Sequence, residues 1–204
     1  MLTSVSELAE SGGSRRRRAD ARRSAQAILD AAIVLLGRHH DASMDDVASA
    51  AGVARQTVYA HYPNREALLG AVIDRTTADV RRALDQVDLD GGSATDALRR
   101  WLQASWQLIE QYPILLSPVL AASDPRTDHD RHIPIIEGLY RLIQRGQQVG
   151  EFDPAPAADW LVAATIGLGH AAGQEASAGR MSVTAAGAAF RDSVLRITLV
   201  AGDS

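Results

Sequence analysis

The chain has 204 residues, of which 46% are hydrophobic and 4% aromatic, and it contains no cysteine. A chain of this length can bury a core, and its few aromatic residues and lack of alternating apolar runs favour helices over strands. The absence of cysteine excludes disulfides and thiolate metal sites, and no apolar run approaches the ~20 residues of a membrane span. The N-terminus lacks the apolar segment of a signal peptide, so the sequence predicts a soluble, cytoplasmic, all-α protein with no membrane partner.

The formal net charge of −4 is unevenly distributed along the chain. Residues 1–65 hold 9 arginines against 7 acids, which gives +2, whereas residues 66–204 hold 12 arginines against 18 acids, which gives −6. An acidic surface repels nucleic acid, so only the N-terminal part of the chain has a charge balance suited to contact with it.

Residues 1–19 are predicted to form a disordered basic arm. Scattered polar residues without a sustained period precede a run of four arginines, Arg15, Arg16, Arg17 and Arg18. Such a run ahead of a DNA-binding domain can enter the minor groove or contact phosphates. A solvated tail is the alternative, and the position of the run in the basic part of the chain favours the arm.

Residues 20–66 are predicted to form a DNA-binding head of three helices. The first helix is expected over residues 21–38, where apolar residues recur at helical spacing. His39 and His40 follow as a helix end and loop. They are not predicted to bind a metal, because no acidic or cysteine partner lies at ligand spacing.

The next two helices are short and predict a helix-turn-helix. Ser43 can cap the first of them, with Asp46 three residues on in the manner of a capping box, and Gly52 can end it in the left-handed conformation. The second is expected over residues 54–61 and stops before Pro63. In this motif the second helix lies in the major groove, with its N-terminal residues against base edges.

Side chains of the second helix suit contact with DNA. Arginine can bind guanine bidentately, glutamine can bind adenine, and a threonine methyl can contact a thymine methyl, while tyrosine and histidine can donate to phosphates. Asn64 can cap the following helix, whose N-terminal amides and Arg65 then form a phosphate clamp. A helical corner with a solvated polar face is the alternative. Besides the arginine run, the predicted DNA-binding residues are Ser43, Arg55, Gln56, Thr57, Tyr59, His61, Tyr62 and Arg65.

From about Arg22 to Ile73 the chain closely resembles the TetR family of transcriptional regulators. The resemblance is carried, at fixed offsets, by Ser43, Val47-Ala48, Ala51-Gly52-Val53, Thr57-Val58-Tyr59, His61-Tyr62, Arg65 and Leu68. The chain departs from the family pattern in having His39-His40-Asp41 where a glycine is usual, Ala54 for serine, and Tyr62 and Arg65 for Phe and Lys. The resemblance implies an N-terminal DNA-binding head and a C-terminal domain that binds an effector and dimerises.

Residues 67–204 are predicted to form that helical domain, with about nine helices in the whole chain. A fourth helix over 65–87 is ~35 Å long, enough to leave the head and enter the second domain, and is therefore the candidate lever. Further helices are expected over 93–112, 114–121, 132–149, 159–176 and 182–200.

The last two predicted helices are rich in small residues, which let another backbone approach closely. Packing within one chain is the alternative to packing between two chains. Because a single short head reads DNA weakly, and the last two helices pair in the resembled family, a homodimer through residues 155–201 is predicted.

Five side chains are predicted to line a mostly apolar ligand cavity with a few orienting polar groups. They are Trp101, Trp106, Tyr140, Gln144 and His170. For each one separately, an ordinary role in the core or at the interface is the competing interpretation.

The sequence thus predicts a dimeric, sequence-specific transcriptional regulator, with double-stranded DNA carrying a palindromic operator as one partner. The leading hypothesis is a repressor that a small apolar or amphipathic ligand releases. The alternative is a DNA-bound adaptor or structural protein that docks a protein partner and has no small-molecule effector. An enzyme is not predicted, because the chain has no phosphate loop, cysteine nucleophile or Ser-His-acid constellation with identifiable context, and neither a cofactor nor a metal is predicted.

Overall fold

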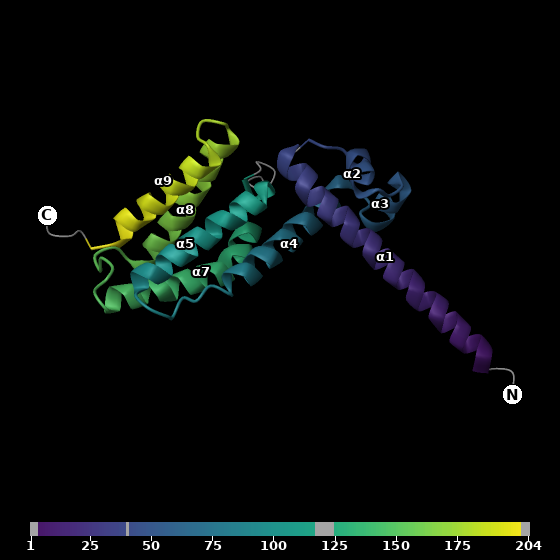
Figure 1. Cartoon of the computed structure of the whole chain (residues 1–204), viewed down its shortest axis with the longest axis horizontal. Coiled ribbons are helices and arrows are strands. Elements are labelled where there is room, and N and C mark those ends of the chain that lie inside the picture. Colours follow the sequence, from purple (N-terminus) through teal and green to yellow (C-terminus); the bar gives the residue numbers. More distant parts are fainter. Residues whose placement is uncertain (1–3, 40, 117–124, 201–204) are drawn as a thin grey trace. The chain divides into compact units, whose positions relative to one another are not determined.

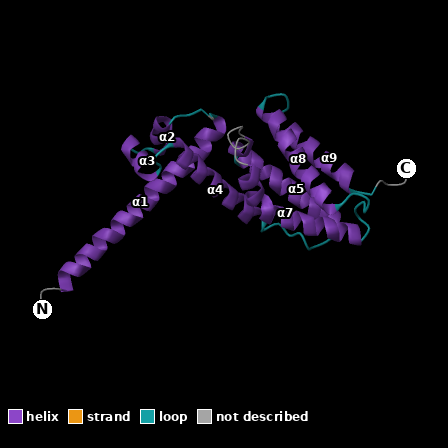
Figure 2. Ribbon diagram, turned by 180° about the vertical axis from the view of Figure 1, so that it is seen from behind, coloured by secondary structure: helices purple, strands orange, loops and turns teal. Residues whose placement is uncertain are grey.

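The structure of the chain is a computed structural model that describes residues 4–39, 41–116 and 125–200 (Figures 1 and 2). Within these ranges it contains eight α-helices and one short 3-10 helix, and its only β-type pairing is an isolated bridge between Phe152 and Leu199. The predicted all-α fold is confirmed. The chain divides into two compact units, residues 1–74 and 75–204.

Each unit is built from consecutive helices. Unit 1 contains α1 (Ser4–Arg38), α2 (Met44–Ala51), α3 (Arg55–His61) and the first part of α4 (Arg65–Leu84). Unit 2 contains the rest of α4, followed by α5 (Ala94–Gln111), η1 (Pro113–Leu116), α7 (Pro125–Gln148), α8 (Ala158–Ser177) and α9 (Val183–Thr198). The division between the units and the predicted boundary at residue 66 both fall within α4.

Three helix boundaries differ from the sequence-based expectation. α1 begins at Ser4, so backbone predicted to be a disordered arm is helical; alanine and arginine are good helix formers, and extending a helix is easier than starting one. α4 ends at Leu84 because Gln86 and Val87 bond three positions back instead of four, as in Val87 N to Leu84 O at 3.0 Å. α7 begins at Pro125, within a predicted loop, and proline is well suited to the first position of a helix.

The core of unit 1 forms where α1 packs on α2 and α3. Ile28, Ala32 and Leu36 on α1 are at most 2% exposed, and Val47 on α2 and Val58 on α3 are at most 1% exposed. These positions lie three to four residues apart on α1, so one stripe of that helix meets both helices of the motif. The apolar stripe predicted for this segment is confirmed.

The core of unit 2 lies between α5, α7, α8 and α9. Trp106 on α5 is 1% exposed and packs against Phe190 on α9, with ring centroids 5.9 Å apart. α9 can come so close because it carries Gly187 there, where a Cβ atom would collide with the Trp106 indole. α8 and α9 pack against each other along the unit. No described helix is long and apolar enough to cross a membrane.

Candidate nucleic-acid interface

The start of α2 is fixed by a reciprocal cap. Asp46 N donates to Ser43 Oγ at 3.2 Å, and Ser43 N donates to Asp46 Oδ2 at 2.8 Å, so the predicted capping box is confirmed. Hydrogen bonds from the hydroxyl and the backbone of Ser43 lower the pKa of the Asp46 carboxyl. The Ser43 hydroxyl is thus engaged within the protein, and its contact with DNA stays a prediction.

The turn between α2 and α3 is made by Gly52, which has φ 66° and ψ 32°. Its N–H donates to Ser49 O at 3.2 Å, and Val53 N donates to Ala48 O at 3.0 Å, which is the bonding pattern of a Schellman motif. Only glycine adopts this conformation without cost, so the residue fixes the point at which the chain turns into α3.

α3 presents a short polar surface. Val58 is fully buried against the unit 1 core, while Arg55, Gln56 and Tyr59 are exposed, in the N-terminal and central part of the helix. The other predicted DNA-binding residues of this segment, Thr57, His61 and Tyr62, are only half-exposed, and burial raises the pKa of the Tyr62 hydroxyl. The polar surface of α3 therefore consists mainly of Arg55, Gln56 and Tyr59.

The Arg55 guanidinium is held by two neighbours. Its Nη1 lies 2.6 Å from Asp45 Oδ2 on α2, and its Nη2 donates to Tyr59 Oη at 3.4 Å. The guanidinium also lies 5.3 Å from the centroid of the Tyr59 ring, a cation–π distance. Sequence analysis did not identify Asp45 as part of this surface, because the contact joins two helices and follows no spacing along either.

The start of α4 is tied to the loop before α2. Arg65 Nη1 donates to the backbone carbonyl of Ala42, and Asn64 Oδ1 accepts from Ala67 N at 2.8 Å, which confirms the predicted cap. Arg65 thus supports the motif from within the protein as well as lying at the predicted phosphate clamp. The side chains of the arginine run at 15–18 lie outside the residues whose side chains the structure describes.

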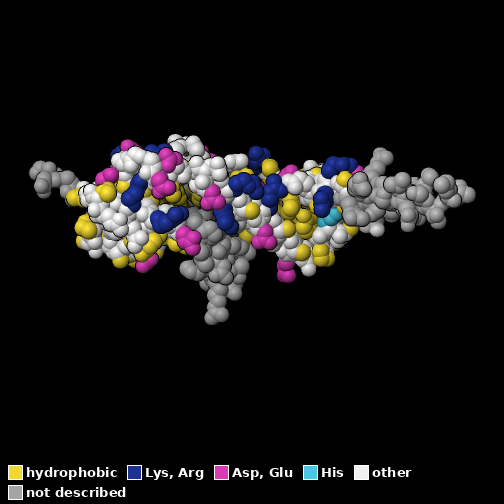
Figure 3. Space-filling model, turned by 90° about the horizontal axis from the view of Figure 1, so that it is seen from below, with side chains coloured by type: hydrophobic (Ala, Val, Ile, Leu, Met, Phe, Trp, Pro, Cys, Tyr) yellow, Lys and Arg dark blue, Asp and Glu magenta, His cyan; other side chains and the backbone are white. Residues whose placement is uncertain are grey.

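Arginine and acidic side chains are interspersed on the face drawn in Figure 3. The charge on that face therefore does not delimit a DNA-binding surface, and the geometry of the helix-turn-helix carries the argument. Among described residues, no group of three or more His, Cys, Asp or Glu side chains is placed to hold a metal ion.

Comparisons with known proteins agree with this geometry. Residues 28–72 match the pattern of the bacterial regulatory proteins of the tetR family. They include the end of α1, all of α2 and α3, and the start of α4. Over 107 residues the chain is 36% identical to the HTH-type transcriptional repressor LfrR of Mycolicibacterium smegmatis, a match covering 49% of this chain and 57% of the repressor. The matched part of this chain is therefore similar to the tetR family, and the match spans just over half of the length of LfrR.

Solved structures extend the similarity beyond the head. The crystal structure of LfrR from Mycobacterium smegmatis in complex with proflavine has a TM-score of 0.66 and 27% identity, covering 88% of this chain and 98% of that one. A putative regulator from Saccharomonospora viridis in complex with choline has a TM-score of 0.74 at 18% identity, covering 87% and 98%. The second similarity shows the fold alone.

The five predicted ligand residues have different environments. Trp101 is 5% exposed, and Trp106, which donates from Nε1 to Glu110 Oε1 at 3.0 Å, is 1% exposed, so both are part of the unit 2 core. Tyr140 and Gln144 are half-buried on α7, and Gln144 Nε2 donates a hydrogen bond to Tyr140 Oη at 2.9 Å. His170 is exposed on α8. Their role in binding a ligand stays a prediction.

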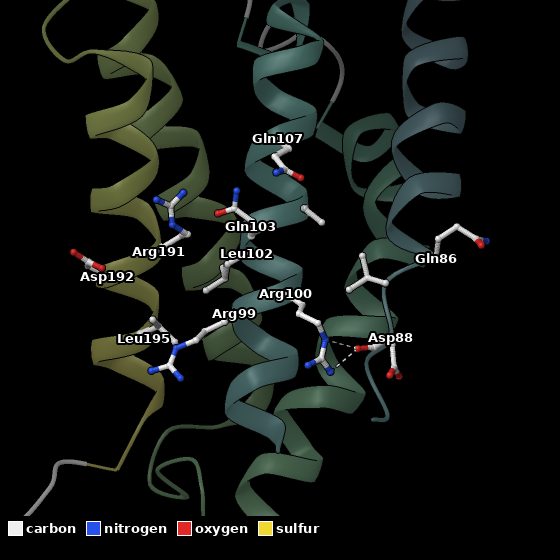
Figure 4. Close-up of a pocket in the computed structure, with 12 residues that line it drawn as sticks. Gln86, Asp88, Arg99, Arg100, Leu102, Gln103, Gln107, Arg191, Asp192 and Leu195 are labelled. Atoms are coloured by element: carbon white, nitrogen blue, oxygen red, sulfur yellow. Dashed lines mark hydrogen bonds between the residues drawn. The ribbon is translucent and has the colours of Figure 1, made fainter. Parts of the chain in front are cut away.

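A groove of about 700 Å³ lies elsewhere in unit 2, along α5 (Figure 4). The segment after α4 and helix α9 form its sides, and none of the five predicted ligand residues lines it. Sequence analysis missed this groove because its walls come from segments far apart in the chain.

Proposed function

We propose that this chain is a sequence-specific, DNA-binding transcriptional repressor that reads an operator with α3. The observation that carries the proposal is the exposed face of α3. Arg55 and Gln56 are exposed at the first two positions of this helix, while Val58 is buried in the core of unit 1. These are the positions that meet base edges when such a helix enters the major groove. Arginine and glutamine are also the side chains that form bidentate contacts with guanine and adenine.

A DNA-binding titration tests this assignment directly. Fluorescence anisotropy of the full chain is measured on duplexes from its own upstream region and on shuffled duplexes of equal composition. Gln56→Ala is expected to lose ~1–3 kcal/mol on the preferred duplex only. Gln148→Ala, a change to another exposed glutamine at the end of α7, is the matched control and is expected to bind as the parent does. Equal losses on both duplexes for Gln56→Ala would refute its role in base recognition.

We further propose that the chain dimerises through α8 and α9. Trp160 on α8 is 65% exposed and Ile197 on α9 is 39% exposed, on the two helices that lie within residues 155–201. Gly167 supports the proposal independently, because a Cβ there would meet nothing within 4 Å. A helical glycine in open space costs ~1 kcal/mol relative to alanine, and close approach of a second chain explains its presence.

The dimer is tested by the mass of the chain in solution. Gly167→Leu is expected to give a folded monomer by light scattering, because the leucine fills the space reserved for the partner. Ala83→Leu, at an exposed position of α4, is the control and is expected to leave the dimer intact. A parent chain that is already monomeric would overturn the dimer and give weight to an adaptor that docks a different protein on the exposed α8 and α9 residues.

The proposed repressor is released when a small apolar or amphipathic ligand binds unit 2. α4 supports a route for this signal, because one continuous helix contributes to both compact units. A ligand shifts the equilibrium only by as much as it prefers one arrangement of the helices over the other. Repeating the titration across a panel of apolar and amphipathic compounds is expected to find one that abolishes saturable binding to DNA; a compound that binds unit 2 saturably and leaves the DNA affinity unchanged would contradict release by that ligand.

A further inference from the structure

The groove along α5 lies wholly within unit 2 and is distinct from the DNA-binding head. Its volume of about 700 Å³ falls within the range of small-molecule sites, roughly 300–1,000 Å³. Its walls combine apolar residues with arginines and glutamines from α5 and α9. The charges of these residues, and what each already contacts, indicate what the groove can bind.

On the side toward α4, the charged groups are occupied by the fold. Arg100 donates to Asp88 O at 3.1 and 2.9 Å and to Gly91 O at 2.6 Å, which fastens the connection between α4 and α5. The Asp88 carboxylate accepts the N–H groups of Asp90 and Gly91, and these bonds lower its pKa. Neither side chain is available to a ligand without loss of those bonds.

On the side toward α9, the cationic groups are available. Arg99 has one weak ion pair, 3.5 Å from Nη1 to Asp96 Oδ1, in which both side chains are more than half exposed. Within the described residues, Arg191 and Gln103 have no hydrogen-bond or ion-pair partner. Figure 4 shows Arg191 and Gln103 pointing toward one another from α9 and α5, and Arg99 extending toward α9, while Asp192 points away from α5. Arg191 and Gln103 therefore face the same stretch of the groove, and Arg99 lies further along it, beside Leu195.

Apolar side chains complete this part of the groove. Leu102 on α5 is fully buried, and Leu195 on α9 is half-buried beside Arg99 (Figure 4). The groove thus combines an apolar wall with the Arg191 guanidinium and with Arg99, which is only weakly paired with Asp96. Guanidinium groups bind carboxylates through paired N–H donors, and such charge-assisted bonds are about twice as strong as neutral ones.

We propose that this groove is a binding site for a small organic acid. Arg191 binds its carboxylate, Gln103 donates from its amide to the same group, Leu102 and Leu195 contact its apolar body, and Arg99 adds positive charge further along the groove. The site is separate from the five residues predicted to line an effector cavity, and its occupancy does not depend on the chain binding DNA.

Benzoate is a suitable probe, since it joins a carboxylate to an apolar ring. Full-length protein labelled with ¹⁵N is titrated with benzoate and, in parallel, with benzamide, which has the same shape without the charge. Saturable amide shifts at α5 and α9 with a Kd of roughly 1 mM or tighter are expected for benzoate, and at least ~10-fold weaker binding for benzamide.

Substitutions locate the site. Arg99→Gln combined with Arg191→Gln is expected to weaken benzoate at least ~10-fold while the far-UV spectrum stays that of the parent. Arg196→Gln, at an exposed position of α9 outside the groove, is the matched control and is expected to bind benzoate as the parent does. Equal binding of benzamide, absence of saturable shifts, or full binding by the double variant would overturn the proposal. None of these results bears on DNA recognition, so the two proposals fail separately.

Discussion

Replacing Gly52 with alanine tests whether the turn of the helix-turn-helix depends on a left-handed residue. A Cβ at Gly52 would meet nothing within 4 Å, so the cost of the change is entirely in the backbone at φ 66°. That cost is ~1–2 kcal/mol for a residue with a side chain. Gly70→Ala is the matched control, because Gly70 is also in unit 1, its Cβ would also meet nothing, and it lies within α4.

The two variants are expected to change stability in opposite directions. Alanine is better than glycine in a helix by ~1 kcal/mol, so Gly70→Ala should stabilise unit 1. Both variants have the same composition, so most of the effect of losing a glycine from the unfolded chain cancels between them. The free energy needed to open α2 and α3 locally is therefore expected to be ~2–3 kcal/mol lower in Gly52→Ala than in Gly70→Ala.

Hydrogen exchange measures this difference within the full chain. Peptides covering α2 and α3 report on unit 1, while the fluorescence of Trp101, Trp106 and Trp160 reports on unit 2, because all three tryptophans lie there. The fluorescence is expected to be the same in both variants. If Gly52→Ala protected α2 and α3 as well as Gly70→Ala does, the argument from the left-handed turn would be wrong.

Three further predictions concern charge. Asp45→Asn breaks an exposed ion pair with Arg55 that is worth at most ~1 kcal/mol. Fluorescence anisotropy should therefore show tighter binding to all duplexes. Weaker binding would mean that Asp45 positions Arg55 for DNA. The Glu151 carboxylate accepts hydrogen bonds from the first N–H groups of α5, and these bonds lower its pKa. The stability that the charged carboxylate adds is therefore complete above the ordinary glutamate pKa and is lost as the pH falls through the lowered pKa. Glu151→Gln should remove this part of the acid sensitivity in thermal melts. Deleting residues 1–18 should flatten the salt dependence of DNA binding, and an unchanged slope would show that the arm makes no contact with phosphate.

Much of unit 1 could be predicted because its signals are local. The cap at Ser43 involves a partner three residues away, and the left-handed turn needs a glycine at one position, Gly52. Contacts that join separate helices could not be predicted in this way. Arg55 meets Asp45 on another helix, and Arg65 bonds to the carbonyl of Ala42, and both depend on how the helices pack.

Unit 2 was harder to predict from sequence. Trp106 was predicted to line a ligand cavity, yet it is 1% exposed and belongs to the core of unit 2. Gly187 lets α9 pass directly over the indole, and the spacing along α5 does not indicate which helix covers it. The groove has the same origin, because Gln103 and Arg191 come together only through the packing of α5 and α9.

The central claim is that α3 of a two-fold dimer reads an operator. Selection of bound duplexes from a randomised pool, followed by sequencing, tests it most directly. The account predicts enrichment of an inverted repeat whose half-site centres are about one helical turn, ~34–36 Å, or a multiple of it apart. It also predicts that the enrichment disappears when Arg55 and Gln56 are both replaced by alanine. No enrichment by the parent chain, or the same repeat enriched by the double variant, would contradict it.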